Sequence, residues 1–147
     1  MGVANQQATS NPVVPSGTLA LIIFGFVLGL AGLFFGVPLT LLGVVGIGVG
    51  CWRSAGYYVA AGATLQYRRL AGVLLLLWGG TVASFWALYL RAAHLNAGVL
   101  PNRPDAAVAR QVENLQNLMW PLMAAGIALL VVVGWVLLRM AKQARNN

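Results

Sequence analysis

Few residues in this sequence could carry out chemistry. The 147 residues include one histidine, His94, one cysteine, Cys51, and two acids, Asp105 and Glu113. Acid–base or nucleophilic catalysis needs an acid, a base or an activated nucleophile held in a pocket. Both acids lie in one segment between apolar stretches, and no histidine accompanies the cysteine. The sequence therefore predicts no catalytic residues, and we expect that the protein is not an enzyme.

The same residues provide no expected metal or cofactor site. Cofactor ligands in helical bundles project from facing helices into the core, whereas His94 follows an apolar run and stands alone. Cys51 has no partner for an intrachain disulfide and is expected to pack as a small apolar side chain. A proton-coupled carrier needs an ionisable residue within a membrane span, and the apolar runs contain no carboxylate. We predict no metal and no cofactor, although a lipid or pigment could bind.

Three long runs without charged residues indicate the class of protein. Residues 1–52 contain no Lys, Arg, Asp or Glu, and Leu70–Leu90 and Asn114–Leu138 are also uncharged. About 20 consecutive, mostly apolar residues are needed to cross a bilayer as a helix. Charged residues make up only 7% of the chain, compared with about 25% of a soluble domain. The sequence predicts an all-α integral membrane protein.

Helix length and helix-breaking residues divide these runs into four expected membrane-spanning helices. Residues 18–52 would form a straight helix of about 52 Å, against a hydrocarbon core of about 30 Å. We expect a break at Gly36–Pro38, because proline disfavours helical geometry in the preceding residue and begins helices well. The expected helices are about 18–36, 38–58, 70–90 and 119–140, with Pro121 near the start of the last. This domain, 18–140, would lie between a polar N-terminal tail, 1–17, and a basic C-terminal tail, 141–147.

A short amphipathic helix is expected before the last crossing, at about residues 105–118. Asp105 can cap its N-terminus, and Arg110 and Glu113 share its polar face at a spacing of three residues. Its apolar face comprises Val108, Val112, Leu115 and Met119. Two placements remain open, because such a helix could lie on the outer membrane surface or continue the fourth crossing.

Glycines recur at helical spacing in the first two expected helices. They are Gly25, Gly29, Gly32 and Gly36 in the first helix and Gly43, Gly46 and Gly50 in the second. Residues three or four apart lie on one helix face, and glycines on that face allow two backbones to approach closely in lipid. We therefore expect a glycine-rich hairpin, whose contact face could pack within this bundle or against another membrane protein.

Aromatic residues mark one side of the third expected helix. They are Trp78, Phe85, Trp86 and Tyr89. Such a stripe could stack against a quinone, carotenoid or chlorophyll. It could equally contact lipid or pack in the core, and without a polar partner it does not specify a ligand.

The basic residues are distributed unequally between the two sides of the predicted bundle. With four crossings, the side that holds both termini carries six basic residues, and the other side carries three together with both acids. The positive-inside rule places both termini in the cytoplasm of a bacterial inner membrane, or on the matching side of a thylakoid-type membrane. The expected anchors at this interface are Trp52, Arg53, Tyr57, Tyr58, Arg68 and Arg69. The net charge of +7 is thus better explained by lipid phosphates than by nucleic acid.

Two classes of function fit these observations. The first is a non-catalytic accessory, structural or assembly subunit of a larger membrane complex, such as a respiratory or photosynthetic one. Its partners would be membrane lipids and other integral membrane subunits, with no nucleic acid. The alternative is a small oligomeric pore or holin-like protein, but Thr40, Thr81 and Ser84 supply little polar material for a lumen. We favour the first class.

Overall fold

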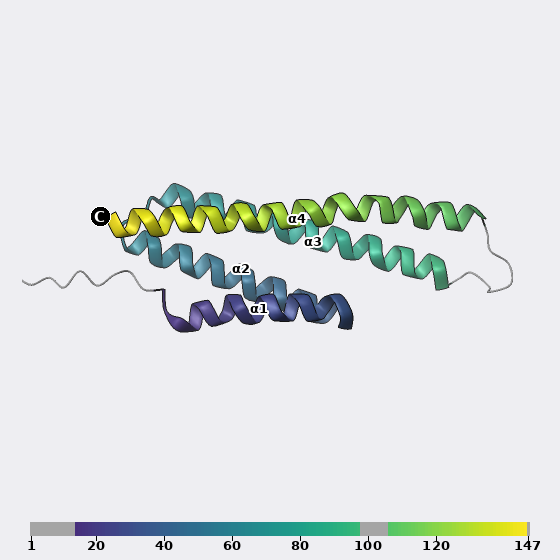
Figure 1. The fold of residues 1–147 in the computed structure, drawn as a ribbon, viewed down its shortest axis with the longest axis horizontal. Helices are drawn as coiled ribbons and strands as arrows, with labels where there is room; N and C mark the ends of the chain where they lie inside the picture. Colours follow the sequence, from purple (N-terminus) through teal and green to yellow (C-terminus); the bar gives the residue numbers. More distant parts are fainter. Residues whose placement is uncertain (1–13, 98–105, 147) are drawn as a thin grey trace, which may run out of the picture.

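The computed structural model describes residues 14–97 and 106–146, which form four long α-helices (Figure 1). The helices are α1 (Ser16–Phe35), α2 (Val37–Ala60), α3 (Leu65–Ala97) and α4 (Ala106–Asn146). Each of them is long and apolar enough to cross a membrane. The prediction of an all-helical fold with four candidate spans is therefore confirmed. Most of the expected polar tail, 1–17, and the expected cap Asp105 lie outside the described residues.

The first two helices meet where the sequence predicts a break. Gly36 separates them and adopts a φ of 102°, a left-handed conformation that glycine reaches without the steric cost of a side chain. Its N–H donates a hydrogen bond of 2.8 Å to the carbonyl of Gly32, which closes the last turn of α1. Pro38 follows in the first turn of α2, where an amide N–H has no helical partner and proline is tolerated.

The third helix is longer than the expected 70–90. It includes Arg68 and Arg69 in its first turns and Arg91 and His94 in its last turns, so His94 lies within the helix. Charged side chains limit the depth of a helix in the membrane, but they are compatible with helical geometry in the headgroup layer or in water. Its 33 residues correspond to about 50 Å, well beyond a hydrocarbon core of about 30 Å.

The fourth helix includes the segment for which the sequence predicts a short amphipathic helix. Residues 106–118 form the first turns of α4, which continues without interruption to Asn146 over 41 residues. Of the two placements left open by the sequence, the structure thus has the continuing helix. Pro121 lies inside this helix and not near its start. A proline that lacks its own N–H leaves one helical hydrogen bond unmade, and the turns on both sides of Pro121 hold the helix together.

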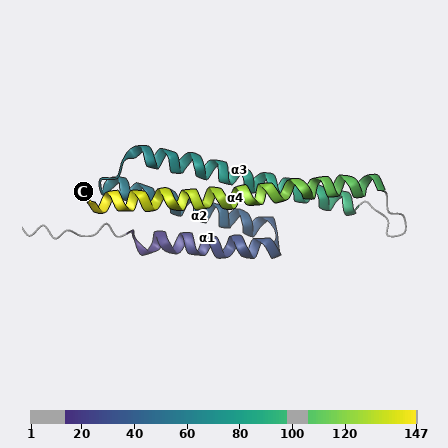
Figure 2. The same ribbon diagram turned by 45° about the horizontal axis from the view of Figure 1, so that its top comes forward.

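The helices form two pairs, α1 with α2 and α3 with α4, which are packed more extensively within each pair than between them. Among the described helices, the backbone of α1 approaches α2 alone, while α2 also approaches α3 and α4. The start of α1, the turn between α2 and α3, and the end of α4 lie at one end of the molecule (Figure 1). At the other end, α3 and α4 extend beyond the turn between α1 and α2 (Figures 1 and 2).

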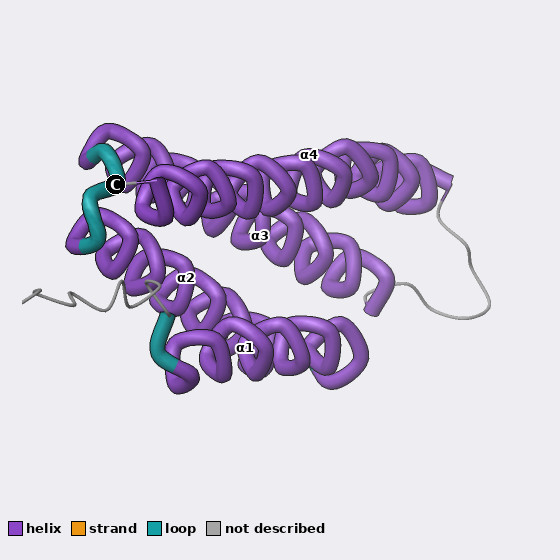
Figure 3. The backbone as a smooth tube through the Cα atoms, turned by 60° about the vertical axis from the view of Figure 1, so that its left-hand side comes forward, coloured by secondary structure: helices purple, strands orange, loops and turns teal. Residues whose placement is uncertain are grey.

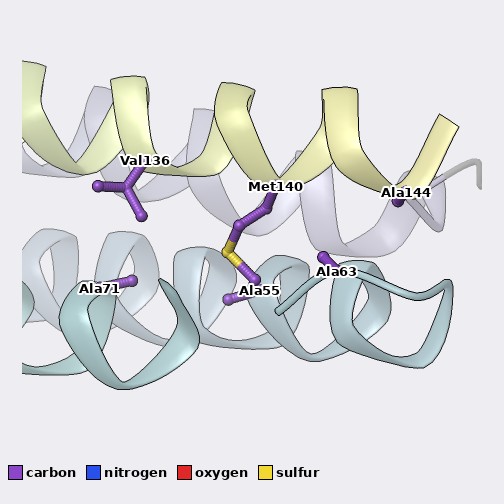
Figure 4. Packing of buried hydrophobic residues seen from close by; sticks show 6 residues of the cluster. All are labelled: Ala55, Ala63, Ala71, Val136, Met140 and Ala144. Carbon is purple, nitrogen blue, oxygen red and sulfur yellow. The ribbon is translucent and has the colours of Figure 1, made fainter. Parts of the chain in front are cut away.

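Two buried clusters hold α2, α3 and α4 together. In the first, the fully buried Met140 and Val136 of α4 face small residues of α2, α3 and the turn between them (Figure 4). These small residues are Ala55, Ala63 and Ala71, and Ala144 completes the cluster. Alanines let helices approach closely, which favours van der Waals packing in lipid. The second cluster, nearer the middle, comprises Ile47, Cys51, Trp78 and Val133. The tube in Figure 3 shows α1 beside this three-helix core, next to α2.

Candidate functional sites: the helix contact and the basic end

The contact between α1 and α2 is made by backbone atoms. A Cβ atom on Gly25 would lie 2.7 Å from the Ile47 nitrogen and 2.9 Å from the Gly43 carbonyl oxygen. A Cβ atom on Gly43 would lie 2.6 Å from the Gly29 Cα. Side chains essentially never come so close to a backbone atom, so neither glycine can carry a side chain unless the helices move apart. The two backbones are in direct contact along this face.

The remaining glycines of the predicted packing set differ in their surroundings. A Cβ atom on Gly32 would meet the Thr40 backbone, one on Gly46 would lie 3.0 Å from the Gly25 Cα, and one on Gly50 would meet the Ile22 side chain. Cβ atoms on Gly29 and Gly36 would point into open space. The backbone atoms of Gly29 therefore contact Gly43 of α2, although a side chain on Gly29 would not meet α2. Gly36 allows the turn, because glycine can adopt its positive φ.

The aromatic stripe of α3 is divided between the interior and the surface. Trp78 is buried in the middle cluster, and Trp86 is also buried. The Trp86 ring lies edge-on to Phe85, with 6.1 Å between ring centroids, and edge-on to Tyr89, with 5.2 Å. Phe85 is half-buried and Tyr89 is exposed. Such edge-to-face pairs are favourable packing arrangements of aromatic rings.

The end of the bundle that holds the start of α1 and the end of α4 is strongly basic, and we refer to it as the basic end. Its cations are Arg53, Arg68, Arg69, Arg139, Lys142 and Arg145. The only carboxylate among the described residues, Glu113, lies near the opposite end of α4. One of these cations stacks on an aromatic ring of its own helix: the Arg139 Cζ atom lies 4.9 Å from the centroid of the Trp135 ring. No described carboxylate neutralises the basic end.

Arg68 and Trp52 form a reciprocal contact between α2 and α3. The Arg68 guanidinium carbon lies 4.6 Å from the centroid of the Trp52 ring, a cation–π geometry. The Trp52 ring occupies the space beside Gly72, where a Cβ atom would lie 2.7 Å from Trp52 Cζ3. The Arg68 guanidinium in turn lies against Gly56, 3.8 Å from the position of its missing Cβ. Each large side chain thus rests on a glycine of the opposite helix.

The other predicted anchors at the basic end take part in no described polar interaction. Arg53, Tyr57 and Arg69 are exposed, and Tyr58 is half-buried against the first buried cluster. The pairing of Arg68 with Trp52, and the two glycines that admit it, are not evident from the expected helices. The spacing of these residues in the sequence could have indicated the contact. Positions 52 and 72 are each ten residues from Gly62, and positions 56 and 68 are each six residues from it; Gly62 is the turn residue with a φ of 100°.

Three hydroxyl groups of the bundle donate hydrogen bonds to carbonyls three or four residues earlier in the chain. Ser54 Oγ donates to the Gly50 carbonyl at 2.9 Å, and Thr81 Oγ1 donates to the Trp78 carbonyl at 2.7 Å. Thr40 Oγ1 donates to the Gly36 carbonyl at 3.4 Å. Within residues 14–97 and 106–146, no three His, Cys, Asp or Glu side chains gather where they could hold a metal ion. His94 and Glu113 are both exposed.

Comparisons with protein-family models, curated proteins and solved structures found no match to this chain. Two features of the described residues are candidates for a functional role. They are the glycine contact between α1 and α2 and the basic end with its Arg68–Trp52 contact.

Proposed function

We propose that this protein is an integral membrane protein that acts as a non-catalytic accessory, structural or assembly subunit of a larger membrane complex. The proposal rests on the positions of the potentially reactive side chains and of the side chains that pack between helices. His94 and Glu113 are exposed near one end of the α3–α4 pair, where water screens their charges. The inter-helix contacts described above consist mainly of glycine, alanine, aliphatic and aromatic residues.

The dimensions of the helices support insertion in a bilayer. The 20 residues of α1 span about 30 Å, which equals the thickness of a typical hydrocarbon core. The uncharged run Leu70–Leu90 within α3 spans about 31 Å and ends at an arginine on each side. The exposed surface of α1 is apolar, as lipid or another membrane helix requires, with Phe34 86% exposed at the end of the helix.

The charge distribution supports one orientation. The basic end carries six cations, whereas the opposite end carries Arg91 and Arg110 among the described residues. We infer that the basic end faces the cytoplasm of a bacterial inner membrane, or the matching side of a thylakoid-type membrane. Both termini would then lie on that side. The glycine contact is a glycine-rich hairpin in this setting, and lipids and other integral membrane subunits are the expected partners.

The alternative, a small oligomeric pore or holin-like protein, has less support. A water-filled lumen needs polar side chains that face the water. Thr40 and Thr81 donate their hydroxyl hydrogens to carbonyls of their own helices, and Thr40 is buried against α1. Ser84 is exposed, but its neighbours on α3 are largely apolar.

The proposed role predicts that the chain is found in a heteromeric particle. A chain tagged after Asn147 would be extracted from its native membrane with a mild detergent and measured by native gel electrophoresis and native mass spectrometry. We expect a particle that contains other integral membrane proteins in fixed stoichiometry. Recovery as a monomer or a homo-oligomer alone, under conditions that preserve known complexes of the same membrane, would contradict the subunit role and favour the pore.

A further inference from the structure

We propose that the α2–α3 part of the basic end binds the headgroup of an anionic phospholipid, with Arg68 as the principal contact. This inference goes beyond the subunit role and does not depend on the identity of any complex. It rests on the packing of Arg68, on the charges around it and on its level in the membrane.

The packing of Arg68 fixes the position of its guanidinium. The group lies over the Trp52 ring and against Gly56, so the side chain is half-buried and packed on two sides. A guanidinium that is held in place loses less entropy when it binds a second group. Arg69, the next residue, is exposed and has no described stacking partner. The two adjacent arginines therefore differ in preorganisation, although they share the same charge and the same end of α3.

The charge of Arg68 lacks a counter-charge within the described protein. Its Nε is a buried nitrogen without a hydrogen-bond partner, and the basic end has no described carboxylate. Since Nε is covered, a ligand would meet the guanidinium at its two terminal nitrogens, which are the donors that pair with phosphate oxygens. A phosphate group would supply acceptors for these two terminal nitrogens, which donate no described hydrogen bond, and the missing negative charge.

The position of Arg68 favours a lipid phosphate over a soluble one. Arg68 and Arg69 directly precede the uncharged run Leu70–Leu90, which places them at the headgroup layer. Exposed apolar side chains continue from the site toward the middle of the helices, with Val49 one turn from Trp52 and Leu76 one turn from Gly72. These side chains could contact acyl chains while the guanidinium binds the headgroup. An anionic lipid also fits the six cations of the basic end, Arg68 included, better than a zwitterionic one.

The test uses the full chain in detergent and compares neighbouring arginines. Dioleoyl phosphatidylglycerol is titrated into the wild type, Arg68→Gln and Arg69→Gln, and bound lipid is counted by native mass spectrometry. Dioleoyl phosphatidylcholine and inorganic phosphate are titrated in parallel. We expect Arg68→Gln to weaken phosphatidylglycerol binding about 10- to 100-fold, as loss of charge-assisted hydrogen bonds implies. We expect Arg69→Gln to weaken it no more than about fivefold, the effect of one surface cation near anionic lipid.

Several outcomes would overturn the proposal. Equal losses in the two variants would show a diffuse basic surface. Binding of phosphatidylcholine as tight as that of phosphatidylglycerol would show no recognition of net charge, and competition by millimolar inorganic phosphate would identify a soluble anion as the ligand. If circular dichroism shows that Arg68→Gln does not fold, Arg68→Lys replaces it in the titrations. It keeps the charge but lacks the planar fork, and we expect a loss of binding that exceeds that of Arg69→Lys; equal effects would contradict the site.

Discussion

Replacing Gly43 with alanine is expected to disrupt the α1–α2 pair and to sharply reduce the amount of folded protein in the membrane. The added Cβ atom would lie 2.6 Å from the Gly29 Cα and 2.7 Å from the Gly25 carbonyl oxygen. Both neighbours are backbone atoms and cannot rotate away, so α1 has to move. Overpacking costs about 1–3 kcal/mol and occasionally more, and α1 is held by α2 alone among the described helices. The measurement is thermal unfolding of the purified protein, together with its abundance in membranes.

Gly48→Ala provides a matched control on the same helix. A Cβ atom at Gly48 would meet nothing within 4 Å, and alanine is the better helix former by about 1 kcal/mol. We therefore expect this variant to be as stable as the wild type or slightly more stable. If Gly43→Ala and Gly48→Ala had the same unfolding temperature and the same abundance, the direct backbone contact between α1 and α2 would be contradicted.

Replacing Trp78 with alanine is expected to have the second large effect. Trp78 is only 5% exposed and packs among residues of α2 and α4, including Ile47 and Val133. Truncation of a buried tryptophan costs about 3–5 kcal/mol in soluble proteins. We expect the lower part of this range, because helix association in lipid depends on packing without a hydrophobic transfer from water. The measurement is again thermal unfolding in detergent.

Trp120→Ala is the corresponding control, because Trp120 belongs to α4 but is 68% exposed. We expect it to lower the unfolding temperature much less than Trp78→Ala. A large destabilisation by Trp120→Ala with none by Trp78→Ala would contradict the structure, in which Trp78 is buried and Trp120 is exposed. The outcome also bears on the aromatic stripe, since a Trp78 that packs in the core has little surface left for a pigment or quinone.

The sequence predicts the number of helices well because lipid constrains composition strongly. Uncharged runs identify all four candidate spans, and Gly36 with Pro38 identifies the first turn. The same reasoning places both ends of α3 too close to its middle, because charged residues limit the depth of a helix in the membrane without ending the helix. Arg91 and His94 continue α3. Residues 106–118 continue α4 across Pro121, which is one of the two placements that the sequence leaves open.

Spacing alone predicts which glycines share a helix face, but not which of them need the absence of a side chain. Gly29 and Gly43 belong to the same contact, yet a Cβ atom would be accommodated on Gly29 and excluded on Gly43. The difference depends on the relative rotation of the two helices, which no single helix specifies. Similarly, the stripe of α3 does not reveal that Trp86 is buried and Tyr89 is exposed.

The contact of Arg68 with Trp52 depends on the register of the α2–α3 turn. The sequence identifies both residues as interface anchors, one on each helix. Their meeting follows only once Gly62 is known as the turn residue, with the glycines at positions 56 and 72 opposite the two large side chains. A shift of the turn by one residue would separate them, because it rotates the face that each helix presents to the other by about 100°.

We expect four helices to cross a membrane with the basic end inside. Topology reporters after Asn147, at Gly62 and in the connection between Ala97 and Ala106 distinguish this arrangement from the others. Each reporter would be active only on one side of the membrane. The reporters at Asn147 and Gly62 are expected to be cytoplasmic, and the reporter between α3 and α4 is expected to be external. An external reporter at Asn147, or reporters on the same side at Gly62 and between α3 and α4, would contradict it.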